Sequence, residues 1–262
     1  MRILMAVDWR DTACEAMSAR EWACVEAALG ACVRGDAVLP GDDGSLLPWE
    51  SHSKASEADS NTRVTWKLTV AYLGHAFSGF AWQKYAVKPT VQGCLQDAIL
   101  PLLDGRSELR LSCAGRTDAG VSALGQLVSF HSPPGLTARV LSEAIAKASP
   151  EAGALRLVRA RRMDRSYHAT FSTSWRRYAY LLPPSSNQSH EDITDEATRI
   201  NAMLRPLEGE TRDYAALGRS VPEGKETAAL LRHASARVVS IPGGGVATRV
   251  DLVGDRFLRR QV

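Results

Sequence analysis

The order of apolar patterns between residues 64 and 161 is the feature that most constrains the fold. In VTWKLTVAY, residues 64–72, apolar and polar side chains alternate, as in a strand with one buried face. Residues 90–103 and 137–149 instead repeat apolar side chains every three or four positions, as amphipathic helices do. Short runs typical of strands occupy residues 109–113, 124–130 and 155–161. The order is therefore strand, helix, strand, strand, helix, strand.

This order is that of a ferredoxin-like (RRM-like) unit. A helical pattern near residues 194–207 and two strand patterns at 230–241 and 246–253 follow in the rest of the chain. Together these patterns predict an α+β fold. The predicted boundaries are 1–61, 62–183 and 184–262.

Charge is distributed unevenly along the chain. Residues 1–61 hold 5 Lys/Arg and 11 Asp/Glu, whereas the remainder holds 27 and 18. The basic part is where a nucleic acid would bind. The first 61 residues contain one helical pattern, at 13–33, followed by a polar stretch with Pro and Gly. We interpret them as an acidic extension and linker.

Five cysteines without a CxxC pair suit a reducing compartment and argue against structural zinc. No apolar run reaches the length of a membrane helix, and the amino terminus does not resemble a secretory signal. We therefore expect an intracellular protein of the cytoplasm or nucleus, with an organelle left open.

CAGRTDAGVSALGQLVSF, residues 113–130, places two opposite charges on one short loop. Arg116 and Asp118 are two positions apart, so their side chains face the same way on an extended segment. Gly115 and Gly120 allow a sharp turn and the close approach of a ligand. These residues alone leave two interpretations open, a surface turn with a paired aspartate and a carboxylate in a functional cleft.

Residues 156–177 hold seven arginines and a single acid, Asp164, interleaved with aromatic residues. Guanidinium groups bind phosphates and flat rings stack on exposed bases, so this mixture suits RNA binding. A solvated charged surface is the alternative interpretation. The predicted RNA-binding residues, including two near the end of the chain, are Arg162, Arg165, His168, Arg176, Arg177, Arg259 and Arg260.

Three motifs in the same order resemble those of the TruA-type tRNA pseudouridine synthases. They are the aromatic-glycine-aromatic loop GHAFSGFAWQ, the loop GRTDAGV, and YHATFSTSWRRYAY. The resemblance covers about residues 64–262. It implies a fold of two ferredoxin-like halves that form a mixed, mainly antiparallel sheet with helices on one face. It implies that Asp118 is the catalytic carboxylate and that Tyr178 stacks on the target uracil. It also implies that Arg116 pairs with Asp118 and fills the space left by a flipped nucleotide.

The resemblance implies isomerisation of uridine to pseudouridine at positions 38 to 40 of the tRNA anticodon arm, without cofactor or metal. Most bacterial members have His at the position of Ser122. A serine there resembles the eukaryotic members, which act at positions 38 and 39. Bacterial members are dimers, which leaves a homodimer open. GDRFLRRQV resembles the start of a longer helix in the family, so we expect the second half to be incomplete.

Two other functions are compatible with the residues. One is a non-catalytic RNA-binding protein of ferredoxin-like fold, although no RNP1-like pattern is present. The other is a hydrolase that cuts an N-glycosidic bond and uses Asp118 alone.

Overall fold

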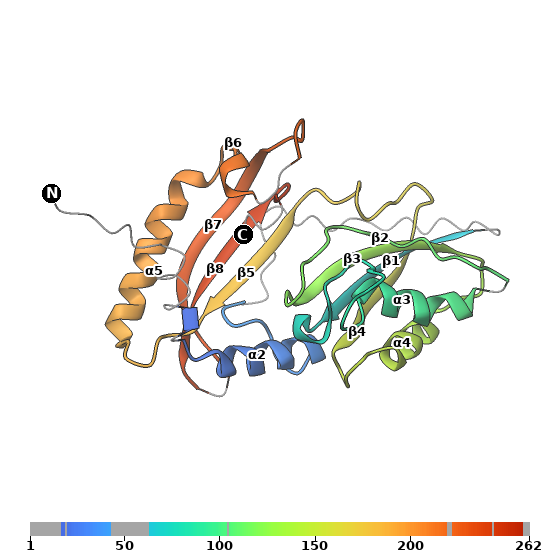
Figure 1. Ribbon diagram of the computed structural model, residues 1–262, viewed down its shortest axis with the longest axis horizontal. Helices are drawn as coiled ribbons and strands as arrows, with labels where there is room; N and C mark the ends of the chain where they lie inside the picture. Colours follow the sequence, from blue (N-terminus) through green and yellow to red (C-terminus); the bar gives the residue numbers. More distant parts are fainter. Residues whose placement is uncertain are drawn as a thin grey trace. The chain divides into compact units, whose positions relative to one another are not determined.

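The structure, a computed structural model, divides into two compact units. One unit is Leu29–Ser174, and the other combines Trp175–Val262 with Met1–Ala28. Each contains a four-stranded sheet with helices, which confirms the predicted α+β fold (Figure 1). The boundaries predicted from sequence remain predictions. The residues described are 17–18, 20–42, 63–103, 105–218, 222–242 and 244–258.

The sheet of the unit Leu29–Ser174 has the strand order of a ferredoxin-like half, β2-β3-β1-β4. Helix α3 leads from β1 to β2, and helix α4 leads from β3 to β4. Each helix thus joins two strands that run in the same direction and have an antiparallel strand between them. The described ladders are therefore antiparallel throughout rather than mixed. The bounds are β1 (Val64–Tyr72), α3 (Val91–Ile99), β2 (Ser112–Cys113), β3 (Ala123–Ser132), α4 (Ala138–Lys147) and β4 (Leu155–Met163).

The core of this unit lies between the sheet and the two helices. Side-chain hydroxyls of Thr90 and Thr137 cap the first turns of α3 and α4, where the sequence predicts helix starts. The 3-10 turn Leu100–Leu102 then extends α3 almost to the predicted end of that helix. Alternate residues of β1 and the apolar faces of both helices are fully buried, which confirms the predicted periodicity: Trp66, Leu68, Val70, Tyr72, Leu95, Ile99, Leu141 and Ile145.

The opposite face of this sheet, the open face, carries Thr65, Lys67 and Thr69 of β1, because strand side chains alternate between faces. Part of the chain after β4 folds back over it. The backbone amide of Ala169 donates to Ser129 Oγ at 2.9 Å, and Thr170 Oγ1 donates to the Cys113 carbonyl at 2.7 Å. This return segment, residues 164–174, runs on the side of the sheet away from α3 and α4 in Figure 1.

In the second unit, the sheet order is β5-β8-β7-β6, with antiparallel ladders. Helix α5 packs against β7 and β8. It begins four residues earlier than predicted, because Ser189 and Asp192 form a capping box there. The predicted hairpin is confirmed as β7 and β8, joined through Gly244 and Gly245 at positive φ. The bounds are β5 (Arg176–Leu182), α5 (His190–Leu204), β6 (Thr211–Asp213), β7 (Ala228–Ser240) and β8 (Val246–Gly254).

The described part of the amino-terminal segment contains α2 (Trp22–Arg34), near the predicted helix. Arg20 donates to the Pro183 carbonyl at 2.7 Å and forms an ion pair with Glu196 of α5. In the other unit, Arg156 Nε donates to the carbonyl of Val33 at 2.7 Å. Most of the predicted linker lies outside the described residues. No helix within the described ranges is both long and apolar enough to cross a membrane.

Candidate active site

The loop between β2 and β3 holds Arg116 and Asp118 with exposed side chains and Thr117 turned inward. Thr117 Oγ1 lies 2.8 Å from the hydroxyl of Tyr72, a side chain that is 1% exposed. This alternation of exposure agrees with the expectation that residues two apart project the same way. The loop is therefore held to the core through Thr117, and it exposes the side chains of Arg116 and Asp118 to solvent.

The backbone of this loop is fixed by hydrogen bonds along its length. Gln126 of β3 donates from Nε2 to the Gly115 carbonyl, and the amide of Phe80 donates to the Thr117 carbonyl at 3.0 Å. The Asp118 carbonyl accepts from the Val121 amide at 3.3 Å, which closes a turn in which Gly120 has a φ of 83°. A turn of this kind requires positive φ at that position and so favours glycine.

The neighbouring loop, residues 74–80, lies directly against the loop between β2 and β3 that carries Arg116 and Asp118. The amide of Gly74 donates to Ser122 Oγ at 2.9 Å. A Cβ on Gly74 would lie 2.3 Å from the carbonyl carbon and oxygen of Gly120. The aromatic rings of Phe77 and Phe80 are buried in the core of the unit. Sequence reasoning missed Gly74, whose lack of a side chain lets the two loops touch.

We expect Gly74→Ala to lower the free energy of unfolding by about 2 kcal/mol, because the new methyl group meets backbone that cannot rotate away. Gly125→Ala on β3 is the matched control, since its Cβ would lie 3.9 Å from Thr69 Cγ2, an ordinary contact. Urea denaturation of both variants measures the difference. Equal stabilities would show that the two loops are not held in contact.

Tyr72 and Gln126 are the other positioning residues that the sequence did not reveal. Gln126 Nε2 also lies 3.5 Å from the Tyr72 hydroxyl, so the two side chains and Thr117 form one connected group. Gln126 is 9% exposed. A buried amide within an apolar strand was the available signal, because such a group requires hydrogen-bond partners.

Tyr178 lies on β5 in the second unit, opposite Leu252 of β8. Its ring meets that of Phe257 edge to face, with centroids 4.9 Å apart and planes at 79°. Asp118 and Tyr178 thus belong to different units. Their participation in one site remains a prediction.

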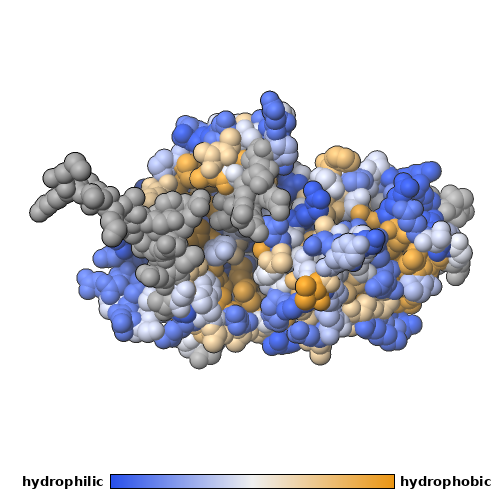
Figure 2. Space-filling view, in the orientation of Figure 1, coloured by the Kyte–Doolittle hydropathy of each residue, from blue (hydrophilic) through white to orange (hydrophobic). Residues whose placement is uncertain are grey.

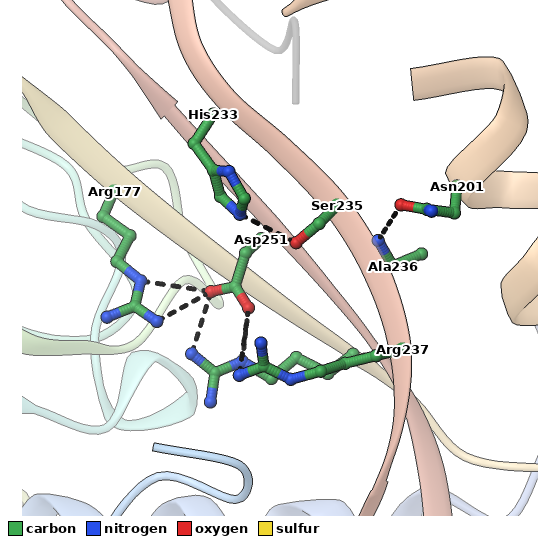
Figure 3. Close-up of polar contacts among 8 residues, drawn as sticks. Arg177, Asn201, His233, Ser235, Ala236, Arg237 and Asp251 are labelled. Atoms are coloured by element: carbon green, nitrogen blue, oxygen red, sulfur yellow. Dashed lines mark hydrogen bonds and ion pairs between the residues drawn. The ribbon is translucent and has the colours of Figure 1, made fainter. Parts of the chain in front are cut away.

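Arg177 and Arg176, predicted to bind RNA, both contact the second unit's own chain. Arg177 Nη2 lies 3.0 Å from Asp251 Oδ1, and Arg176 Nη1 donates to the Asp255 carbonyl. Figure 3 shows the arginine side chains converging on Asp251. Arg249 Nη2 donates to Asp251 Oδ1 at 2.8 Å, and Arg237 Nη2 lies 3.9 Å from Oδ2.

Asp251 is 2% exposed, and Arg249 is 0% exposed. Burial acts to raise the pKa of the Asp251 carboxyl, but the hydrogen bond and charge of Arg249, together with Arg177, outweigh it. The pKa of Asp251 is therefore lowered from its ordinary value. Two of these charges stand two residues apart on β8, a pattern that could have indicated a buried pair.

The other predicted RNA-binding residues on the described chain lie in the unit Leu29–Ser174. Arg162 is exposed, with its guanidinium 5.6 Å from the centroid of the Trp66 ring, and Arg165 is exposed. The ring of His168 stacks on Phe171 at 4.5 Å, and Phe171 is 85% exposed. Arg259 and Arg260 lie outside the described residues.

The surface on the visible side is mostly hydrophilic, with apolar residues in small groups (Figure 2). Phe171 is 85% exposed and follows Arg165 and His168 closely in the sequence. An exposed ring near cationic residues suits contact with a flat, charged ligand.

Comparison with known proteins identifies one family. The sequence model of the tRNA pseudouridine synthases matches residues 68–172. The enzyme named tRNA pseudouridine synthase A from Dictyoglomus turgidum is 38% identical over 121 residues, 45% of this chain and 47% of the relative. Proteins of the same name from Lacticaseibacillus casei and Shewanella baltica are 36% and 30% identical.

These relatives differ in how much of their length is matched. The alignment with the Lacticaseibacillus casei protein covers 59% of this chain and 64% of the relative. The alignment with the Shewanella baltica protein extends over 205 residues, 74% of this chain and 73% of the relative. The chain thus spans less than two thirds of the length of the first two relatives.

Proposed function

We propose that this chain, which belongs to the tRNA pseudouridine synthase family, isomerises uridine to pseudouridine in tRNA. The observation that carries the proposal is the exposed carboxylate of Asp118 on a loop anchored from both sides, inside the segment that matches the family. A carboxylate held on a rigid backbone and open to a ligand is what a reaction at a sugar carbon requires.

The reaction breaks the bond from C1′ of ribose to N1 of uracil, turns the base, and forms a bond from C1′ to C5. The proton lost from C5 is balanced by one gained at N1, so the product is an isomer and no cofactor is required. Asp118 is the group that acts at the sugar, either by attack at C1′ or by removing a sugar proton. Tyr178 stacks on the loosened uracil and assists removal of the C5 proton.

The target nucleotide must leave the RNA stack before its sugar can reach Asp118. Extruding a base costs a few kcal/mol, which phosphate contacts and stacking offset. Arg116 is exposed on the same loop as Asp118, so it can fill the vacated space and pair with the carboxylate between turnovers. The loop thereby combines base extrusion and chemistry.

We place the substrate uridines in the anticodon arm, at positions 38 to 40, where extrusion at a stem end is least costly. Arg165 and the His168–Phe171 stack supply phosphate and base contacts from one unit. Arg162 lies opposite Trp66, on the face of the sheet that α3 and α4 cover, and is included on sequence grounds. Arg176 and Arg177 contact Asp255 and Asp251 of their own unit, so they are included, like Arg259 and Arg260, on sequence grounds.

A tritium-release assay tests the proposal. The purified protein is incubated with an unmodified tRNA transcript that carries tritium at C5 of uridine. We expect release of tritium without free uracil. Free uracil would indicate hydrolysis of the N-glycosidic bond, and tight binding without release would indicate a non-catalytic RNA-binding protein; either result would overturn the proposal.

A further inference from the structure

Three cations from two adjacent strands lie together on the open face of the sheet in the unit Leu29–Ser174. Lys67 of β1 is directly opposite Arg161 of β4, and Thr69 is opposite Arg159. Arg159 and Arg161 therefore project to the same side of the sheet as Lys67. Opposite residues in an antiparallel pair have Cβ atoms about 5 Å apart, a distance at which like charges destabilise a sheet.

The positive charges on this face lower the pKa values of two titratable groups on the same face. Burial and then the charges of Arg161 and Arg159 lower the pKa of Lys67. Further along the same face, burial and then several cations, beginning with Arg63, lower the pKa of His131. Two titratable groups on one face thus both experience an excess of positive charge.

No carboxylate of the described residues forms an ion pair with any of these three cations. The ion pairs in this part of the chain involve other arginines and leave out Lys67, Arg159 and Arg161. The neighbours of Lys67 are Ser129 on β3 and the ring of Tyr167, whose centroid lies 5.7 Å from Nζ. Arg159 and Arg161 are exposed, so an anionic ligand from outside the chain can reach this group of cations.

We propose that Lys67, Arg159 and Arg161 form a binding site for a backbone phosphate of RNA, a role that rests on the proposed function and adds a contact to it. Guanidinium forks and an ammonium group match the geometry and charge of a phosphate. The return segment that carries Tyr167 past Lys67 also carries the stack of His168 on the exposed Phe171. A phosphate site beside an exposed ring is suited to single-stranded or looped RNA.

This site is distinct from the loop that holds Asp118. Lys67 precedes Tyr72, which supports that loop, by five residues of β1. At 3.3 Å per residue the separation along the strand is roughly 17 Å. The site therefore binds RNA that flanks the reacting nucleotide and contributes affinity, while the rate of the bound complex depends on other groups.

A triple variant, Lys67→Gln, Arg159→Gln and Arg161→Gln, tests the site by its affinity for the unmodified tRNA transcript at several salt concentrations. The plot of the logarithm of the tRNA association constant against the logarithm of the salt concentration has a negative slope. Loss of one to two phosphate contacts should make that slope shallower by about 1 to 2 and should weaken tRNA binding at least tenfold. The kcat of the triple variant at saturating tRNA should stay within about twofold of the wild-type value. The matched control is Arg110→Gln, Arg139→Gln and Lys147→Gln, which removes the same charge elsewhere in this unit. Its slope should equal that of the wild type.

A single variant separates loss of the site from loss of the fold. Arg161→Glu places a carboxylate opposite Lys67 and should raise thermal stability while it weakens tRNA binding. Equal losses of affinity in the triple variant and its control would overturn the proposal, as would a wild type that does not bind tRNA. A wild type that binds tRNA but releases no tritium refutes the proposed activity, and the salt series then still decides whether this site exists.

Discussion

Asp118→Asn is expected to slow pseudouridine formation by roughly a thousandfold or more, because an amide can neither attack C1′ nor accept a proton. Asparagine has nearly the shape of aspartate. Backbone groups and the side chains of Thr117, Ser122 and Gln126 hold the loop, so its position should persist. Affinity for tRNA should stay within a few-fold. Single-turnover tritium release measures the rate, and filter binding measures the affinity.

Asp195→Asn is the matched control for this substitution, because Asp195 is also exposed but lies on α5. It should retain the wild-type rate. Both variants should unfold within about 0.5 kcal/mol of the wild type, as expected for exposed positions. Tritium release that persists at the wild-type rate in Asp118→Asn would remove Asp118 from the chemistry and leave the family assignment intact.

The first half of the fold could be predicted from sequence because its signals are local. Alternation in β1 and the three-to-four spacing in α3 and α4 each reflect one buried face. The spacing of Arg116 and Asp118 likewise indicated that both project the same way. The sequence indicated where the carboxylate stands and which neighbour shares its side of the loop.

The groups that hold the loop could not be predicted, because their contacts join distant positions. Thr117 and Tyr72 are 45 residues apart, and Gly74 and Ser122 are 48 apart. Nothing in a local pattern says which buried hydroxyl will meet which loop. Gly74 cannot carry a side chain because the backbone of Gly120 approaches it, and the sequence does not reveal this approach.

The arginine-rich segment, residues 156–177, could be recognised from sequence, but the partners of its arginines could not. Seven arginines in one segment indicated an RNA-binding surface, yet their environments differ. Arg177 pairs with Asp251, which is 74 residues away, whereas Arg159 and Arg161 face Lys67 across the open face. The number of charges in a segment does not tell which cation pairs with a buried carboxylate and which faces solvent, so the partners follow only from the folded structure.

The pairing of Asp251 with Arg249 gives the largest expected effect on stability. Asp251→Asn should lower the free energy of unfolding of the second unit by about 3 kcal/mol, because it removes the charge that offsets the burial of Arg249. Amide hydrogen exchange of β8, which carries this contact, and of its neighbour β5 should become roughly a hundredfold faster. Glu210→Gln, which breaks the exposed pair with Arg212, should cost less than about 1 kcal/mol.

The effect of Asp251→Asn should depend on pH in a defined direction. The pKa of Asp251 is lower in the folded chain than its ordinary value, so its ionised form stabilises the fold above that ordinary value, near 4. This contribution is complete at pH 7 and at pH 5, and it is lost as the pH falls through the lowered pKa. The ratio of the exchange rates of variant and wild type should therefore be constant from pH 7 to about pH 5 and fall toward one below about pH 4. A ratio near one at pH 7 would show that the carboxylate does not offset the buried charge of Arg249.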